Sequence, residues 1–183
     1  MSLPLPPHLL LLLLLLLPPS LSLPPDTFSL CASSDPSLAP TFPSTLLPLT
    51  PDGESCLHLL AISCSLPLLQ SATASLDNHP HRSKVLNLPV ATKTGLDMPP
   101  LSWYVFGLHV DCVEHLVGVE GVEVNLVFRD EKGGRITVMD VVERMRENGG
   151  GGGEVDRMRE VLVRGGAKRR EELEVEDDNK KDL

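Results

Sequence analysis

Two absences divide this sequence into unlike halves. No lysine or arginine precedes Arg82, and no proline follows Pro100, so all 17 prolines lie within residues 1–100. Twelve of the 14 glycines lie beyond residue 100, and four of the six aromatic residues fall between Trp103 and Phe128. A change of composition this sharp predicts a boundary near Pro99-Pro100.

An excess of positive charge is also absent. The net charge of −9 divides into −3 over residues 1–100 and −6 over residues 101–183. A phosphate backbone requires a surplus of Lys and Arg, so nucleic acid is excluded as an expected partner. The mixed charges of the second half are typical of solvated helix faces.

The N-terminal leader, residues 1–22, contains nine consecutive leucines at 9–17, closed by Pro18-Pro19. A helix of that length would span roughly 15 Å, about half of a bilayer's hydrocarbon core, so we expect no transmembrane span. The run has the length of a signal-peptide core, although residues 1–7 carry no basic side chain. A secretory signal, a biased low-complexity leader and a plastid transit peptide all remain open.

Residues 23–100 are rich in proline and serine, and we expect them to be mostly irregular or disordered. Proline removes a backbone donor and restricts the residue before it, so regular structure should not run far. The one uninterrupted apolar stretch, Cys56–Leu66, could form a short helix or a strand. His79 and His81 lie in a loop pattern and are interpreted as solvated side chains.

The four cysteines, Cys31, Cys56, Cys64 and Cys112, match no zinc-site spacing. In a secreted chain they could form two disulfides in any of three connectivities, whereas a reducing compartment would leave them free. We favour free thiols.

Residues 101–165 show regular patterns that predict a partial α/β unit. We expect strands at 101–106 and 121–126, and helices at 109–117, from Thr137 and at about 154–164. Between them we expect a turn at 130–134 and a glycine linker at 149–153. The charged tail over 166–183 is expected to be disordered. This order of strand, helix, strand, helix, helix is typical of an α/β layer with a parallel sheet. Two strands cannot cover both faces of a sheet, so the unit reads as a piece of a larger domain.

The same residues carry a resemblance to a known family. Gly95-Leu-Asp-Met98, Leu101-Ser-Trp103-Tyr-Val-Phe106, His109-Val-Asp-Cys112 and Gly121–Leu126 are similar to the C-terminal end of plant-type UDP-dependent glycosyltransferases. Ile136–Val142 resembles the start of the helix that follows the family's strand at Gly121–Leu126, and Gly153–Arg164 resembles the family's arginine-rich closing helix. The resemblance, over residues 95–164, implies a Rossmann-like fold and sugar transfer from a UDP-sugar to a small-molecule acceptor.

Departures from the family pattern remove its functional residues. The family's proline after tryptophan is Tyr104 here, and its sugar-binding acidic-Gln pair falls at Gly107-Leu108. Its upstream signature and general-base histidine are missing. The resemblance therefore implies an inactive fragment with no catalytic or donor-binding residue and no cofactor, and with UDP-sugar as a partner only if the resemblance is functional.

Other candidate sites are weak. His109, Cys112 and His115, with Glu114 beside them, carry ligands that zinc accepts, but a spacing of three rotates around a helix, so we assign no metal residue. The glycines at 149–153 lead into Glu154, which would repel phosphate. The alternative function is a small secreted or membrane-proximal interaction protein with unknown protein partners. The leader implies secretion if it is a signal, whereas the family resemblance implies the cytoplasm.

Overall fold

In the computed structural model, the residues described are 30–33, 35–37, 54–91, 97–150 and 152–181. The leader (residues 1–22) and residues 38–53 lie outside this set, so the structure does not test the predictions made for those two segments. Helices dominate the described residues, and their strands are short and antiparallel.

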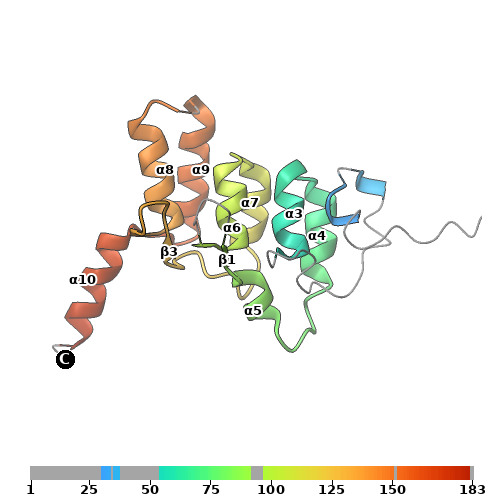
Figure 1. The fold of residues 1–183 in the computed structure, drawn as a ribbon, viewed down its shortest axis with the longest axis horizontal. Coiled ribbons are helices and arrows are strands. Elements are labelled where there is room, and N and C mark those ends of the chain that lie inside the picture. The colour runs from blue at the N-terminus through green and yellow to red at the C-terminus, as the bar shows by residue number, and fades with distance from the viewer. Residues whose placement is uncertain (1–29, 34, 38–53, 92–96, 151, 182–183) are drawn as a thin grey trace, which may run out of the picture.

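Three helix pairs stand in a row (Figure 1). Each pair is an antiparallel hairpin, because only a few residues join its two members. The pairs are α3 (Cys56–Ser63) with α4 (Leu66–Ala74), α6 (Pro100–Phe106) with α7 (Val110–Val117), and α8 (Val138–Glu147) with α9 (Gly152–Arg164).

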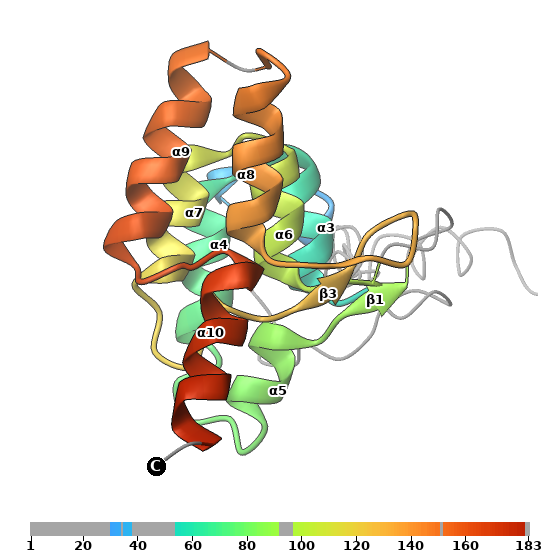
Figure 2. The same ribbon diagram turned by 90° about the vertical axis from the view of Figure 1, so that its left-hand side faces the viewer.

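The helices form two layers. Helix α6 contacts both α3 and α8, and α7 contacts both α4 and α9. Seen from the C-terminal end of the row, one layer contains α3, α6 and α8, and the other contains α4, α7 and α9 (Figure 2). We call these the inner and outer layers.

Two β-hairpins project from the base of the inner layer (Figure 2). Strand β1 (Val90–Ala91) pairs with β2 (Asp97–Met98), and β3 (Phe128–Arg129) pairs with β4 (Arg135–Ile136). Each hairpin directs an opposed apolar pair into the core, Val90 with Met98 and Phe128 with Ile136. Strands β2 and β3 are neighbours, so the hairpins lie side by side.

The three inner helices begin at residues that share one backbone conformation. Ser55, Pro99 and Thr137 are their N-caps, and all three have extended backbone angles. Ser55 with His58, and Thr137 with Asp140, form reciprocal caps in which the third helical side chain accepts from the cap's backbone N–H. Pro100 occupies the first helical turn, where a missing N–H costs nothing.

One core joins all three pairs. Counted from the start of each inner helix, the second residue (Leu57, Leu101, Met139) and the fifth (Leu60, Tyr104, Val142) are buried. The Tyr104 hydroxyl donates to the Leu57 carbonyl at 2.8 Å, linking the first pair to the second. The break in composition at Pro99-Pro100 is therefore not a break in the core.

Two asparagines tie successive units together by the same contacts. Asn87, which ends α5 (Arg82–Asn87), donates to the Gly121 carbonyl at 2.7 Å and accepts from Glu123 N–H at 2.8 Å. Asn125 donates to the Gly166 carbonyl at 3.0 Å and accepts from Lys168 N–H at 2.7 Å. In both loops the glycine has positive φ and the donor follows two residues later, so the connection between units is itself repeated.

Several predictions from the sequence are wrong here. Residues 101–106 form helix α6 and residues 121–126 form turns, so the described residues contain no parallel sheet. Residues 54–91, expected to be irregular, contain α3, α4 and α5, and the charged tail forms α10 (Arg170–Lys181). The C-terminal half is not an open piece with an uncovered interior, because α3 and α4 close its core.

Other predictions are confirmed. The helix expected at 109–117 is α7, the helix capped by Thr137 is α8, and the turn at 130–134 joins β3 to β4. The helix expected from Glu154 is α9, which begins two residues earlier, at Gly152.

Candidate binding surface

A hollow lies between the inner helix layer and the second hairpin. It has a volume of about 450 Å³, and its apolar walls come from Phe106, Ile136, Val141 and Met145. Asp130, Glu131, Lys132, Arg144 and Asn148 form its polar rim. A hollow of this size with an apolar floor can accept one large apolar side chain.

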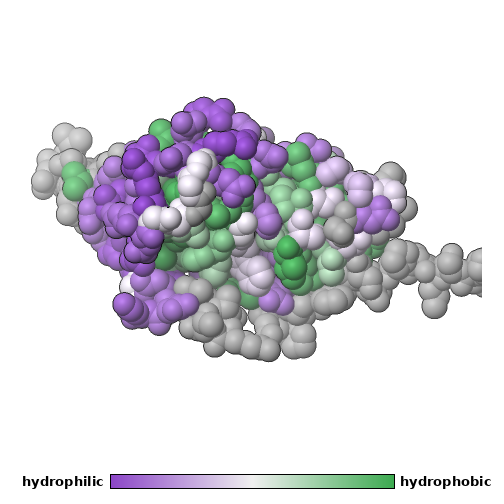
Figure 3. All heavy atoms as spheres, turned by 90° about the horizontal axis from the view of Figure 1, so that it is seen from above, coloured by the Kyte–Doolittle hydropathy of each residue, from purple (hydrophilic) through white to green (hydrophobic). Residues whose placement is uncertain are grey.

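The seventh residues of the inner helices form a row that continues from this hollow, apolar in α3 and α6 and charged in α8. Ile62, Phe106 and Arg144 are each the seventh residue of their helix, and these helices are neighbours. Ile62 is 67% exposed and Phe106 is 40% exposed. Figure 3 shows hydrophobic residues gathered over the first two helix pairs and hydrophilic residues over the third. We call the row and the hollow together the inner groove.

Asp130 fixes the hairpin that forms one wall of the groove. Its Oδ1 accepts from the backbone N–H of Lys132 at 3.0 Å and of Gly134 at 2.6 Å, while its Oδ2 lies 3.2 Å from Arg144 Nη1. The Arg144 guanidinium first, and then the Gly134 amide, lower the pKa of the Asp130 carboxyl. The carboxylate therefore stays charged and joins the turn to α8.

The most deeply buried polar pair is Ser55 with His58, and both side chains are fully buried. His58 Nδ1 lies 2.8 Å from Ser55 Oγ and accepts from Ser55 N–H at 3.1 Å. Burial lowers the pKa of His58 to about 4, and the backbone carbonyls of Met98 and Leu88 partly oppose this shift. Serine beside a neutral histidine is the start of a nucleophilic site, but a substrate cannot reach fully buried atoms, so we interpret the pair as a helix cap.

The structure separates the residues that the sequence offered as metal ligands. Cys112 is bonded to Cys64, so it has no thiolate to give. His115 Nε2 lies 2.9 Å from Thr73 Oγ1, and the ring of His109 packs edge-on against Tyr104. Among the described residues no three His, Cys, Asp or Glu side chains are grouped closely enough to hold a metal ion.

The prediction of free thiols is also wrong. Cys31 is bonded to Cys56, and Cys64 to Cys112. The second disulfide joins the α3–α4 turn to α7, so it links neighbouring units. The spacing of the cysteines gave no signal of this pairing, because only the stacking of the helix pairs brings Cys64 and Cys112 together.

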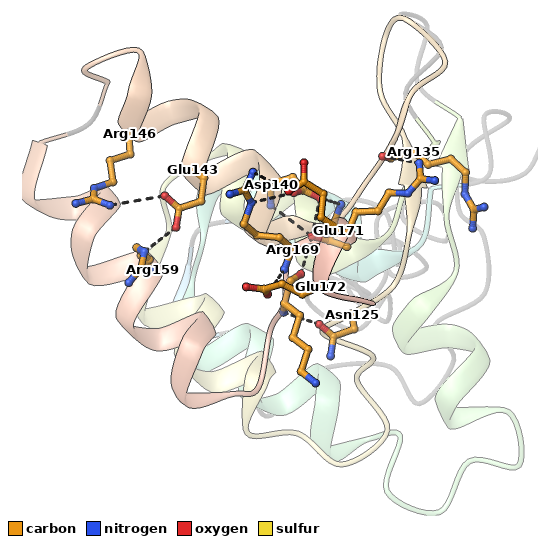
Figure 4. Close-up of polar contacts among 12 residues, drawn as sticks. Asn125, Arg135, Asp140, Glu143, Arg146, Arg159, Arg169, Glu171 and Glu172 are labelled. Carbon is orange, nitrogen blue, oxygen red and sulfur yellow. Dashed lines mark hydrogen bonds and ion pairs between the residues drawn. The ribbon is translucent and has the colours of Figure 1, made fainter. Parts of the chain in front are cut away.

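The third unit carries a network of ion pairs that joins α8 to α9 and to the start of α10 (Figure 4). Glu143 accepts from Arg159 at 2.7 Å and lies 3.7 Å from Arg146. Asp140 lies 3.7 Å from Arg169 and accepts from Arg170 N–H at 3.2 Å, which fastens the start of α10 to α8. At the position of Glu143 the first two inner helices have Ala61 and Val105, both buried, so charged residues replace core residues in this unit.

No family model matches this chain, and no curated protein and no solved structure is detectably similar to it. Its function must therefore be inferred from its geometry. In the part of the chain that the structure describes, no helix has the length and apolar character needed to cross a bilayer.

Proposed function

We propose that this chain is a repeat scaffold whose inner groove binds a segment of another polypeptide. A hairpin followed by two antiparallel helices is the plan of ankyrin-type repeats, in which the first helix starts at a Thr-Pro-Leu-His pattern. Ser55-Cys-Leu-His58, Pro99-Pro-Leu-Ser102 and Thr137-Val-Met-Asp140 stand at that place in the three units and share its cap and its buried second helical residue.

The single observation that carries the proposal is the exposure of Ile62 and Phe106 at equivalent positions of neighbouring helices, where Phe106 also lines the hollow. Scaffolds of stacked repeats bind partners on extended inner surfaces of this kind. The occupant we expect is a segment with a large apolar side chain that enters between Phe106 and Met145, since those walls are apolar and the rim is polar.

Selection of binders from a random peptide library, with the full chain as bait, tests this proposal. We expect Ile62→Glu and Phe106→Glu each to weaken selected peptides by about tenfold or more, as expected for anchor contacts. Val163→Glu is the matched control, because Val163 is also exposed, at 50%, but lies on the outer-layer helix α9. Peptides that bind all three variants as well as the unmodified chain would contradict the proposal.

The proposal develops the interaction-protein alternative drawn from the sequence. The disulfides Cys31–Cys56 and Cys64–Cys112 support an oxidising compartment, where such bonds persist. Together with the leucine-rich leader they favour secretion. Sequencing the N-terminus of the mature protein tests this, because a chain that still begins at Met1 in the cytosol would contradict it.

The resemblance of residues 95–164 to the glycosyltransferase C-terminus stays a prediction. It assigns residues 101–106 to a family segment that here forms helix α6. Titration of a UDP-sugar into the full chain tests it: measurable affinity would support the resemblance, and its absence would leave the repeat scaffold as the better account.

A further inference from the structure

The second hairpin places two like charges directly opposite each other. In the register of β3 and β4, Arg129 is the partner of Arg135, and both side chains are exposed. Like charges directly opposite on one face of an antiparallel pair are destabilising. Neither guanidinium has an ion-pair partner among the described residues, and Figure 4 shows the Arg135 side chain pointing away from the ion-pair network.

The nearby acidic groups leave this positive charge uncompensated. Asp130 is engaged by Arg144 and by two backbone amides, and Glu174 is paired with Arg170. Arg170, whose charge Glu174 compensates, donates to the backbone carbonyl of Arg135 and holds this end of the hairpin against α10. On a chain of net charge −9, the hairpin therefore presents a local basic patch.

Arg135 lines one hollow among the carboxylates of Asp140, Glu143 and Glu171. Together with Arg129 it lines a second hollow, which shares no lining residue with the apolar one. Its volume is about 370 Å³, and its other walls include Asn87, Asp97 and Phe128. Asp97 makes no ion pair with either arginine, and the Asn87 amide is occupied by the 121–123 loop. Among the side chains that line this hollow, the two guanidinium groups are therefore the available donors, and Asp97 is the one carboxylate.

We propose that Arg129 and Arg135 together bind a carboxylate side chain of the partner polypeptide. The inference rests on the proposed function. Guanidinium groups match a carboxylate with parallel hydrogen bonds, and an anion between them removes their repulsion. Ile136 lines the apolar hollow and the adjacent Arg135 lines the basic one. A segment crossing the hairpin can therefore place an apolar side chain in one hollow and an acidic side chain in the other.

The test uses a fluorescein-labelled peptide of about ten residues that alternates leucine with glutamate, long enough when extended to cross the hairpin. A second peptide has glutamine in place of every glutamate. We expect the full chain to prefer the glutamate peptide by about tenfold, and R129Q/R135Q to lose that preference. R157Q/R164Q removes the same charge from two exposed arginines on α9, and it should keep the preference.

Three outcomes would overturn the proposal. One is a preference that survives in R129Q/R135Q or falls equally in both double variants. Another is failure of the unmodified chain to bind either peptide. The last is a single-stranded oligonucleotide that binds as tightly through the same arginines. A Phe106→Glu variant that weakens both peptides and keeps the glutamate preference would support separate hollows. The proposed function is judged independently by the library selection.

Stability provides a further readout that separates binding from a structural role. Removing two repelling charges should leave the melting temperature of R129Q/R135Q equal to or above that of the unmodified chain. A clear fall in melting temperature would assign the arginines to the fold and contradict the binding site.

Discussion

Substituting His58 by glutamine should remove much of the protein's sensitivity to mild acid. His58 is fully buried, and burial lowers the pKa of its ring to about 4, from 6.5 in the unfolded chain. Glutamine is a favoured residue at this third helical position, since its side chain can still accept from the Ser55 N–H as His58 does. The substitution therefore keeps the cap and removes the titrating group.

The sign and size of the effect follow from the two pKa values. Above pH 6.5 the ring is neutral in both states and favours neither. As the pH falls below 6.5 the unfolded chain binds a proton that the folded chain binds only near pH 4, so the folded state loses stability across this window. The shift corresponds to about 3 kcal/mol when complete, and to about 2 kcal/mol at pH 5.

Urea unfolding of the full chain, followed by circular dichroism from pH 7.5 to pH 4, measures this loss. The unmodified chain should lose about 2 kcal/mol between pH 7.5 and pH 5 in excess of H58Q. His115, whose pKa burial also lowers, contributes in the same direction and is retained in both chains. H81Q, which replaces an exposed histidine, is the control and should follow the unmodified chain. Identical pH profiles for H58Q and the unmodified chain would refute the burial of His58.

Three further predictions concern the contacts between units. Gly165→Ala should destabilise the fold by about 1–3 kcal/mol in urea unfolding, because the added Cβ would lie 2.0 Å from Cγ1 of Val117. Val117 is β-branched and cannot rotate freely to make room. Equal stability of the variant would show that α7 and α9 are not in contact. Asn125→Ala should lower the free energy of unfolding by about 1–3 kcal/mol, because it removes the hydrogen bonds from Asn125 to the Gly166 carbonyl and from the Lys168 amide to Asn125. Asn87→Ala should lower it by a similar amount. A loss of stability in only one of these variants would contradict the repeated connection. C64S/C112S should lower the free energy of unfolding by about 2–4 kcal/mol, because the disulfide closes a loop of 48 residues. If reduction leaves the urea midpoint of the unmodified chain unchanged, this would argue against the bond.

Helical periodicity in the sequence is sufficient to predict those helices that lie at the boundary between core and solvent. Helices α7, α8 and α9 each bury one face, so their apolar residues recur at helical spacing. Thr137 with Asp140 also identified the start of α8 correctly. These elements follow from local rules.

Helix α6 was missed because it is short and buried on most sides. Its residues Leu101–Phe106 are apolar, aromatic and β-branched, a composition that favours a strand when packing is unknown. Tertiary contacts override that preference, since α6 lies between α3 and α8. Pro100 in the first helical turn was a usable signal for a helix start.

Helices α3 and α4 were missed for a different reason. Proline was interpreted only as a residue that ends helices, whereas Pro67 lies in the first turn of α4, where it is tolerated. Ser55, Pro99 and Thr137 each precede a similar apolar segment, and this likeness is the signal of repetition that the sequence carries. The inner groove could not be predicted, because Ile62 and Phe106 become neighbours in a row only after the units stack.

Amide hydrogen exchange on the full chain tests the central claim most directly. If three units share one core, the amides of α3 and α4 should be protected and should open with free energies close to those of α6, α7, α8 and α9. Protection confined to residues 100–164, with exchange over 56–74 at the rate of an unfolded chain, would contradict the shared core and the repeat scaffold built on it.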